Sequence, residues 1–212
     1  MATAAEAGKI AVLIPLMRPE KLRKIESDLT YLTPTARLYA AADMNRITPL
    51  VTNLCERVFW DFGNTYARRI NLLAAETYEP YMFLGADDIK FSVGWDECAL
   101  AAMLQPGVVG VNDLHNPHPT HLLVSRAYIE EFGSGTLDNS GLVLHPYKHN
   151  FCDLELVATA KKRGRYYYAK DAIVAHLHPA AGKAEDDEIY ALGRQSYEAD
   201  LMEFESRKHL WA

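Results

Sequence analysis

The segment IAVLIPL at residues 10–16 decides how the rest of the chain is interpreted. It is a continuous apolar run with β-branched members, and such runs are typical of strands buried on both faces of a parallel sheet. Pro15 ends the strand, and the following stretch PEKLRKIESDL places Leu22, Ile25 and Leu29 at helical spacing. A buried strand followed directly by an amphipathic helix predicts the first unit of an α/β fold.

The alternation of strands and helices continues along the chain. Further strands are expected at 36–42, 81–84 and 108–114, in the first part of 121–133 and within 166–178, and helices at 64–78, 94–103, in the rest of 121–133, at 152–164 and from 186 onward. We therefore predict a single α/β domain with an open, mostly parallel, Rossmann-like sheet flanked by helices. Residues 44–63 fit neither pattern, and residues 133–150 are rich in Gly, Asn, Ser and His, which predicts a mobile surface loop.

Composition places the chain among ordinary globular proteins. It has 212 residues, of which 49% are apolar and 24% charged, and this corresponds to one full-sized domain. With 22 basic and 28 acidic side chains the net charge is −6, which disfavours a general binder of phosphate backbones. Three widely spaced cysteines form no disulfide framework, and no apolar run is long enough to span a bilayer. We therefore expect a cytoplasmic protein with no membrane span and no signal peptide.

Acidic and histidine side chains follow the predicted strands. Asp43, Asp87, Asp88, His176 and His178 all stand at such ends, where α/β sheets bind their ligands. Two adjacent carboxylates beside a sheet are costly unless a cation joins them, and hard oxygen ligands suit Mg²⁺ or Mn²⁺. The competing interpretation is a solvated acidic turn. The two histidines, two residues apart on a strand, point to the same side and could supply a further ligand or simply pack.

Two other groups of acidic and histidine side chains have competing interpretations. Asp153 and Glu155 open a predicted helix, where the helix dipole favours acids, but a general base at the mouth of a site is the alternative. His115, His118 and His121 form a regular trio, yet intervening prolines prevent a shared helix face, so the indication of zinc is weak. The dinucleotide fingerprint, the P-loop, the nucleophile elbow and the HExxH motif do not occur.

In this order, and over the whole chain, the elements resemble a glycosyltransferase of the GT-A fold, in the family-2-like group of bacterial and phage enzymes. IAVLIPLMRP resembles the strand and turn that open the nucleotide site, and YARRIN followed by FLGADDIKFSVGW resembles the helix and strand that lead to the DXD motif. HNFCDLELVATAKKRG is similar to the helix carrying the catalytic acid, and IVAHLHPAAGKAEDDEIY to the segment carrying a metal-binding histidine. The chain departs from the pattern at Ala86, in place of the first DXD acid, and at Cys152, where many members have Glu.

The resemblance implies a metal-dependent enzyme that transfers a sugar from a nucleotide-diphospho sugar to an acceptor hydroxyl, with inversion expected. Mn²⁺ or Mg²⁺ would be held by Asp88 with His176 or His178 and would stabilise the charge of the leaving diphosphate. Asp153, with Glu155 beside it, would be the catalytic acid pair, Asp153 deprotonating the acceptor. The donor-binding residues implied are Pro15, Arg18, Asp43, Arg68, Asn71, Asp87 and Lys183.

The resemblance also implies a division of the chain into a flexible N-terminus at residues 1–8, a GT-A domain at 9–184 and a helical tail at 185–212 packed on that domain. One rival is a sugar-phosphate nucleotidyltransferase, although LMRPEKLRK supplies the basic charge after the first strand without the usual glycines. The other rival is a non-catalytic nucleotide- or carbohydrate-binding protein. The acceptor stays open between a sugar, a hydroxyl on a protein and a modified DNA base.

Overall fold

The computed structural model describes residues 9–63, 65–115 and 118–212, so the segment 1–8, expected to be a flexible N-terminus, lies outside the described residues. Strand β1 (Ile10–Pro15) is buried along its whole length, as its apolar run predicts. It pairs in parallel with β2 (Ala36–Ala42) on one side and with β4 (Tyr81–Leu84) on the other. Strand β3 (Arg57–Trp60), within the stretch 44–63 that fits neither pattern, extends this group in parallel beyond β2.

The sheet is mixed, and the prediction of a mostly parallel sheet was wrong. Its order is β3-β2-β1-β4-β7-β6-β8-β5, with four parallel and three antiparallel pairings among the described residues. The further strands are β5 (Ile89–Phe91), β6 (Val108–Asn112), β7 (Leu122–Ser125) and β8 (Tyr166–His176). Nine residues join β6 to β7, fewer than a parallel crossover needs, so β7 turns back beside β6 and runs antiparallel to β4 as well.

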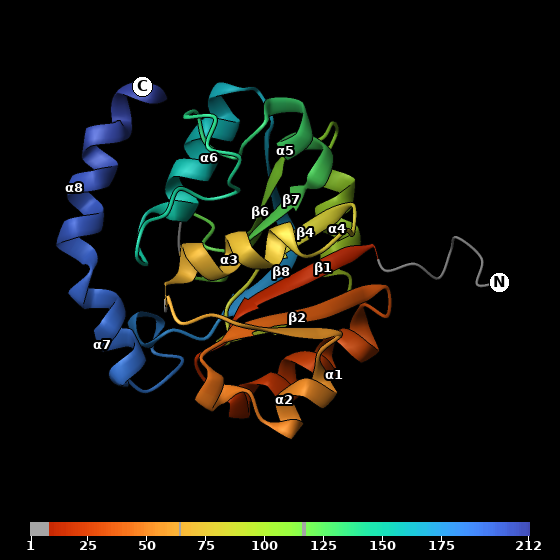
Figure 1. Ribbon diagram of the computed structural model, residues 1–212. Helices are drawn as coiled ribbons and strands as arrows, with labels where there is room; N and C mark the ends of the chain where they lie inside the picture. Colours follow the sequence, from red (N-terminus) through yellow and green to blue (C-terminus); the bar gives the residue numbers. More distant parts are fainter. Residues whose placement is uncertain (1–8, 64, 116–117) are drawn as a thin grey trace.

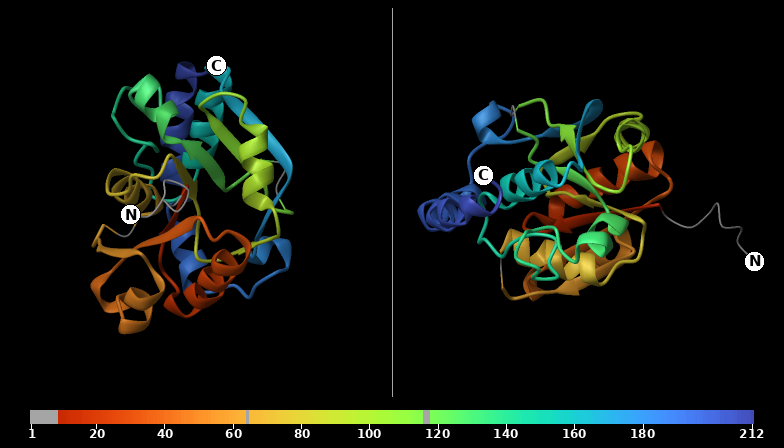
Figure 2. Two further views of the ribbon diagram at one scale, coloured as in Figure 1. Left: turned by 90° about the vertical axis from the view of Figure 1, so that its right-hand side faces the viewer. Right: turned by 90° about the horizontal axis from the view of Figure 1, so that it is seen from above.

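Helices cover both faces of the sheet (Figures 1 and 2). One face is covered by α1 (Leu22–Leu32), α2 (Pro49–Leu54) and α4 (Trp95–Ala102), and the other by α3 (Tyr66–Ala75), α5 (Arg126–Phe132) and α6 (Cys152–Lys162). Strand β1 contributes side chains to the cores on both faces of the sheet. Ile10, Val12 and Ile14 pack on the side of α1, and Ala11 and Leu13 pack on the side of α3. This three-layer packing explains why the strand is apolar at every position.

Helices α7 (Glu188–Gln195) and α8 (Tyr197–Arg207) run along one side of the molecule, with α8 beside α6 (Figure 1). Single-turn 3₁₀ helices are η1 (Pro19–Lys21), η2 (Met44–Arg46), η3 (Pro179–Ala181) and η4 (Lys208–Leu210). Asp200 on α8 accepts hydrogen bonds of 2.9 Å from the backbone N–H groups of Lys148, His149 and Asn150. Among the described helices, none has both the length and the apolar character that crossing a bilayer requires.

Residues 133–150 form no regular helix or strand, as their composition predicts. The segment is nevertheless packed onto the body of the protein. Ser134 and Thr136 are fully buried, and Arg163 donates hydrogen bonds to the carbonyl oxygens of both. Asn71 holds the far part of the segment through the backbone of Leu144, with bonds of 2.8 and 2.9 Å. The segment is therefore fixed by buried polar contacts in this structure.

Candidate active site

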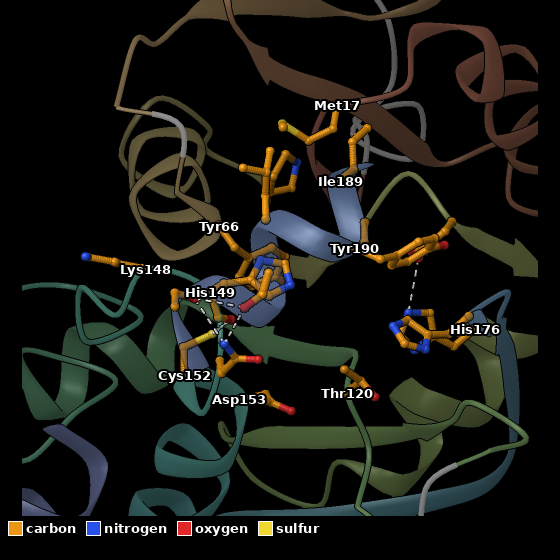
Figure 3. A pocket seen from close by; sticks show the side chains of 18 of the residues that line it. Met17, Tyr66, Thr120, Lys148, His149, Cys152, Asp153, His176, Ile189 and Tyr190 are labelled. Carbon is orange, nitrogen blue, oxygen red and sulfur yellow. Dashed lines mark hydrogen bonds and ion pairs between the residues drawn. The ribbon is translucent and has the colours of Figure 1, made fainter. Parts of the chain in front are cut away.

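A cavity of about 790 Å³ lies at the edge of the sheet where β1, β4 and β8 end. Its walls are the turns after β1 and β4, the end of β8, the starts of α3 and α6, and helix α7 with the start of α8. Four residues that precede β7 complete the lining: His115, His118, Thr120 and His121. Figure 3 shows side chains from these separate elements converging on one space. The volume and the position both match those of ligand-binding clefts in α/β proteins.

Asp87 organises the turn that follows β1. One oxygen of its carboxylate accepts hydrogen bonds of 2.7 Å from the backbone N–H groups of Met17 and Arg18, and the other accepts one of 2.8 Å from the Arg18 guanidinium. The residue is buried and lines the cavity. Its carboxylate therefore fixes the position of Arg18 at the cavity wall.

Asp88 belongs to a cluster with His121 and His176. One ligand atom from each of these three buried residues lies within 4.8 Å of the other two. The second carboxylate oxygen of Asp88, Oδ2, accepts a hydrogen bond of 2.9 Å from the Tyr190 hydroxyl and lies 3.3 Å from Nε2 of His176. Burial alone would raise the pKa of Asp88, but the hydrogen bond and charge of His176 outweigh it and lower that pKa.

The polar atoms left over in this cluster fit a metal ion. Oδ1 of Asp88, Nε2 of His121 and Nδ1 of His176 are buried and have no hydrogen-bond partner among the described residues. Buried polar atoms are normally satisfied, so three in one cluster indicate a place for a ligand. Nδ1 of His121 lies 3.3 Å from the Leu84 carbonyl oxygen and donates a hydrogen bond to it, which leaves the lone pair of Nε2 available to a metal ion. One carboxylate and two imidazoles are a common ligand set for divalent transition metals.

His178, the other histidine of the predicted metal pair, lies outside this cluster. It lines the cavity, but its Nδ1 accepts a hydrogen bond from the backbone N–H of Ala180 and caps η3. Its ring packs edge-on against Tyr190 with the ring centroids 4.8 Å apart. Of the two histidines, the structure brings His176 to Asp88.

The two acids at the start of α6 have opposite surroundings. Asp153 lines the cavity, and burial raises its pKa to about 6 against the opposing effect of backbone hydrogen bonds at the helix start. Glu155 is fully buried behind the helix, where it accepts hydrogen bonds of 2.6 Å from the Tyr147 hydroxyl and 2.6 and 2.9 Å from Arg207. Asp153 alone of the two faces the space where a substrate would lie.

Of the seven residues predicted to bind the donor, three line the cavity and four do not. Pro15, Arg18 and Asp87 line the cavity. The other four lie outside its lining and have partners within the chain. Arg68 pairs with Asp61, Asp43 pairs with Arg46 and Arg69, Asn71 holds the segment 133–150, and Lys183 donates to the Leu114 carbonyl.

Sequence reasoning missed three residues of the cavity wall. His121 was considered as one of a histidine trio and not placed with Asp88, because the strand it precedes was expected to be parallel. The register pairs Leu122 with Leu84, so the antiparallel β7 begins where β4 ends and brings His121 to the site. Arg69, buried and bonded to the Leu16 carbonyl, takes the wall position expected of its neighbour Arg68. Tyr190, in the predicted tail, had no signal in the sequence that tied it to the acids.

Comparison with known proteins gives a fold and no family. No protein-family model matches the chain, and no curated protein matches it. Among solved structures, S. aureus TarS 1-349 in complex with UDP-GlcNAc has a TM-score of 0.62 at 12% identity, covering 86% of this chain and 60% of that one. The same fragment in complex with UDP has a TM-score of 0.59 at 11% identity, covering 78% of this chain and 59% of that one. The chain thus spans about three fifths of these structures and shares their fold.

Proposed function

We propose that this protein is a metal-dependent glycosyltransferase of the family-2-like, bacterial or phage type. It would transfer a sugar from a nucleotide-diphospho sugar to an acceptor hydroxyl, with inversion. The observation that supports this most directly is that one cavity holds both the unsatisfied Asp88–His121–His176 cluster and the Asp153 carboxylate. Because the TarS structures contain UDP and UDP-GlcNAc, a uridine diphosphate sugar is the first donor to test.

The cluster would hold the divalent ion through Oδ1 of Asp88, Nε2 of His121 and a ring nitrogen of His176. A bound ion supplies Lewis-acid stabilisation of the leaving diphosphate. Two hydrogen bonds within the chain orient these ligands. The Leu84 carbonyl sets the tautomer of His121, and the Tyr190 hydroxyl donates to Oδ2 of Asp88. Two imidazole nitrogens favour Mn²⁺ over Mg²⁺, which prefers oxygen ligands.

Asp153 would take the proton from the acceptor hydroxyl as that oxygen attacks the sugar. With a pKa of about 6 it is mostly ionised at neutral pH and still basic enough to accept a proton. A protein base that activates the acceptor on the side opposite the leaving diphosphate gives a single displacement, and therefore inversion. Glu155 does not line the cavity, and we assign it a structural role in the attachment of α8.

On the donor side we keep Pro15, Arg18 and Asp87 as residues of the donor site and assign supporting roles to Asp43, Arg68, Asn71 and Lys183. Residues 9–184 would form the catalytic domain, and 185–212 a tail that completes its cavity wall through α7. We keep the cytoplasm as the expected compartment. The acceptor class stays undecided.

The test is calorimetric titration with UDP, with and without Mn²⁺, followed by a hydrolysis screen over nucleotide sugars that detects released nucleotide diphosphate. We expect UDP to bind much more tightly with Mn²⁺, and at least one donor to be hydrolysed. A nucleotidyltransferase would instead release pyrophosphate from a nucleoside triphosphate and a sugar phosphate. Metal-independent binding without turnover would support a non-catalytic binder and overturn the proposal.

A further inference from the structure

Arg18 is the cation at the cavity wall after β1, and its hydrogen-bonding edge is already occupied. Its Nε and Nη2 atoms donate hydrogen bonds of 2.8 Å to the two carboxylate oxygens of Asp187, while Nη1 binds Asp87. The Tyr190 ring covers the guanidinium, with its centroid 4.2 Å from the central carbon. The forked edge of an arginine is the part that binds a phosphate group through two parallel hydrogen bonds. In this structure a carboxylate from the same chain stands in that place.

Asp187 and Tyr190 belong to the start of α7, and we call residues 187–190 the strap. Oδ1 of Asp187 also accepts from the backbone N–H groups of Ile189 and Tyr190, so the residue caps the helix that it anchors. The hydroxyl of Tyr190 reaches Asp88 in the metal cluster. The strap therefore contacts both the anion-binding cation and the metal-binding acid of the donor site.

The strap is held in a way that allows its displacement. The Asp187 side chain is 39% exposed, whereas that of Arg18 is 6% exposed, so water and ligands can reach the carboxylate side of the pair. A carboxylate at the surface is hydrated again when it leaves its partner, which lowers the free-energy cost of separating it from Arg18. Helix α8 is attached separately, through Asp200 and through Arg207 with Glu155. The strap can leave Arg18 without detaching α8.

We propose that Asp187 is a built-in competitor of the donor diphosphate for Arg18, and that donor binding displaces the strap. The proposal rests on the proposed function, since it takes the diphosphate of a nucleotide sugar as the ligand of Arg18. The carboxylate keeps the buried guanidinium paired when no donor is bound. The phosphate oxygens of the donor then take over its two hydrogen bonds.

The experiment compares wild type with Asp187→Asn in calorimetric titrations with UDP and with inorganic pyrophosphate, both with Mn²⁺ present. Asn is as good a helix cap as Asp, so α7 should stay formed while the competing charge is removed. We expect UDP and pyrophosphate to bind roughly fivefold more tightly to the variant, the factor that corresponds to an ion pair of about 1 kcal/mol. The matched control is Asp186→Asn, which removes the same charge one residue earlier, where Asp186 pairs with the exposed Arg194 and not with Arg18.

The outcomes separate the strap from the proposed function. Tighter binding in Asp187→Asn with unchanged binding in Asp186→Asn supports competition at Arg18. If wild type binds UDP and Asp187→Asn binds it equally or more weakly, the strap is part of the binding site and the competition is wrong, while the glycosyltransferase proposal stands. An equal gain in both variants would assign the effect to net charge and would also overturn the proposal. If wild type binds neither UDP nor pyrophosphate, the proposed function fails, and the strap proposal with it.

Discussion

Helix α6 separates two groups of buried polar side chains that look alike in the sequence and differ in the structure. On its cavity side, Asp153 shares a space with a carboxylate and imidazoles that have unsatisfied atoms. On its tail side, Glu155 is enclosed by Arg207 and Tyr147, and its oxygens are taken up by three hydrogen bonds. The two acids are two residues apart, which places them about 200° apart around a helix.

The difference teaches how to distinguish a site from a structural ion pair. A polar cluster whose atoms are all hydrogen-bonded within the chain has no atom available to a ligand. Buried polar atoms without a partner can still form a hydrogen bond or coordinate a metal ion. By this criterion the cavity side has buried atoms available to a ligand, whereas the tail side holds α8 against α6. Four predictions test the contrast.

The largest effect is expected from Asp153→Asn, which keeps the shape of the side chain but cannot accept a proton. Transfer to the acceptor should fall by roughly 10²–10⁴-fold, while Mn²⁺-dependent UDP affinity hardly changes. Glu155→Gln is the matched control and should leave the rate per folded molecule near that of wild type. Greater damage from Glu155→Gln in a steady-state assay would reverse the assignment of the base.

On the tail side the expected loss is in stability. Arg207→Ala leaves the fully buried Glu155 carboxylate without its cation, which should lower the free energy of unfolding by about 3–5 kcal/mol in urea titrations. The double variant Glu155→Met with Arg207→Met removes both charges and should recover most of that loss. No stability change in Arg207→Ala would mean that the ion pair does not hold α8.

His121→Ala tests the cavity cluster. We expect Mn²⁺ affinity to fall by at least the roughly 10–100-fold that loss of a supporting residue around a metal costs. His178→Ala, on the same cavity wall but outside the cluster, is the control and should change Mn²⁺ affinity much less. The measurement is Mn²⁺ titration followed by electron paramagnetic resonance. An equal loss of Mn²⁺ affinity in the two variants would contradict a metal site made of Asp88, His121 and His176.

The smallest effect is a pH dependence. Since the base must be ionised, and burial raises the pKa of Asp153 to about 6, the transfer rate should be flat above that pH and fall about tenfold for each unit below it. The profile should be recorded at saturating Mn²⁺ and donor, with UDP affinity measured at each pH, so that loss of the metal is seen separately. A flat rate down to pH 4.5 with the metal still bound would exclude Asp153 as the base.

Most of the fold could be predicted from the sequence, because its central elements carry strong periodic signals. The buried run of β1, the helical spacing of α1 and the strands β2 and β4 lie where they were expected. Strands β3 and β5 were missed because each is short and contains a charged residue, Arg57 in β3 and Lys90 in β5. The equally short β4 is an uninterrupted apolar run and was predicted. Strand direction was the main error, since an apolar run such as that of β7 has the same pattern whether it is parallel or antiparallel.

The error in strand direction also affected the prediction of the site residues. Asp88 and His176 lie at the ends of strands in the expected direction, and both were singled out. His121 stands at the beginning of its strand, so it reaches the same edge only because β7 runs backward. Which arginine of α3 lines the cavity, Arg69 and not Arg68, depends on the rotation of the helix about its axis, and two adjacent arginines in a sequence do not reveal that rotation.

The attachment of α8 through Arg207 also has a consequence for synthesis of the protein. The chain leaves the ribosome from its N-terminal end, so the strands and α6 emerge before Arg207 does. Until then Glu155 has no cation, and the nascent chain carries a charge that its folded form buries in an ion pair. A product interrupted before α8 would keep an unpaired acid in its interior, and cellular proteases would remove it in preference to the finished protein.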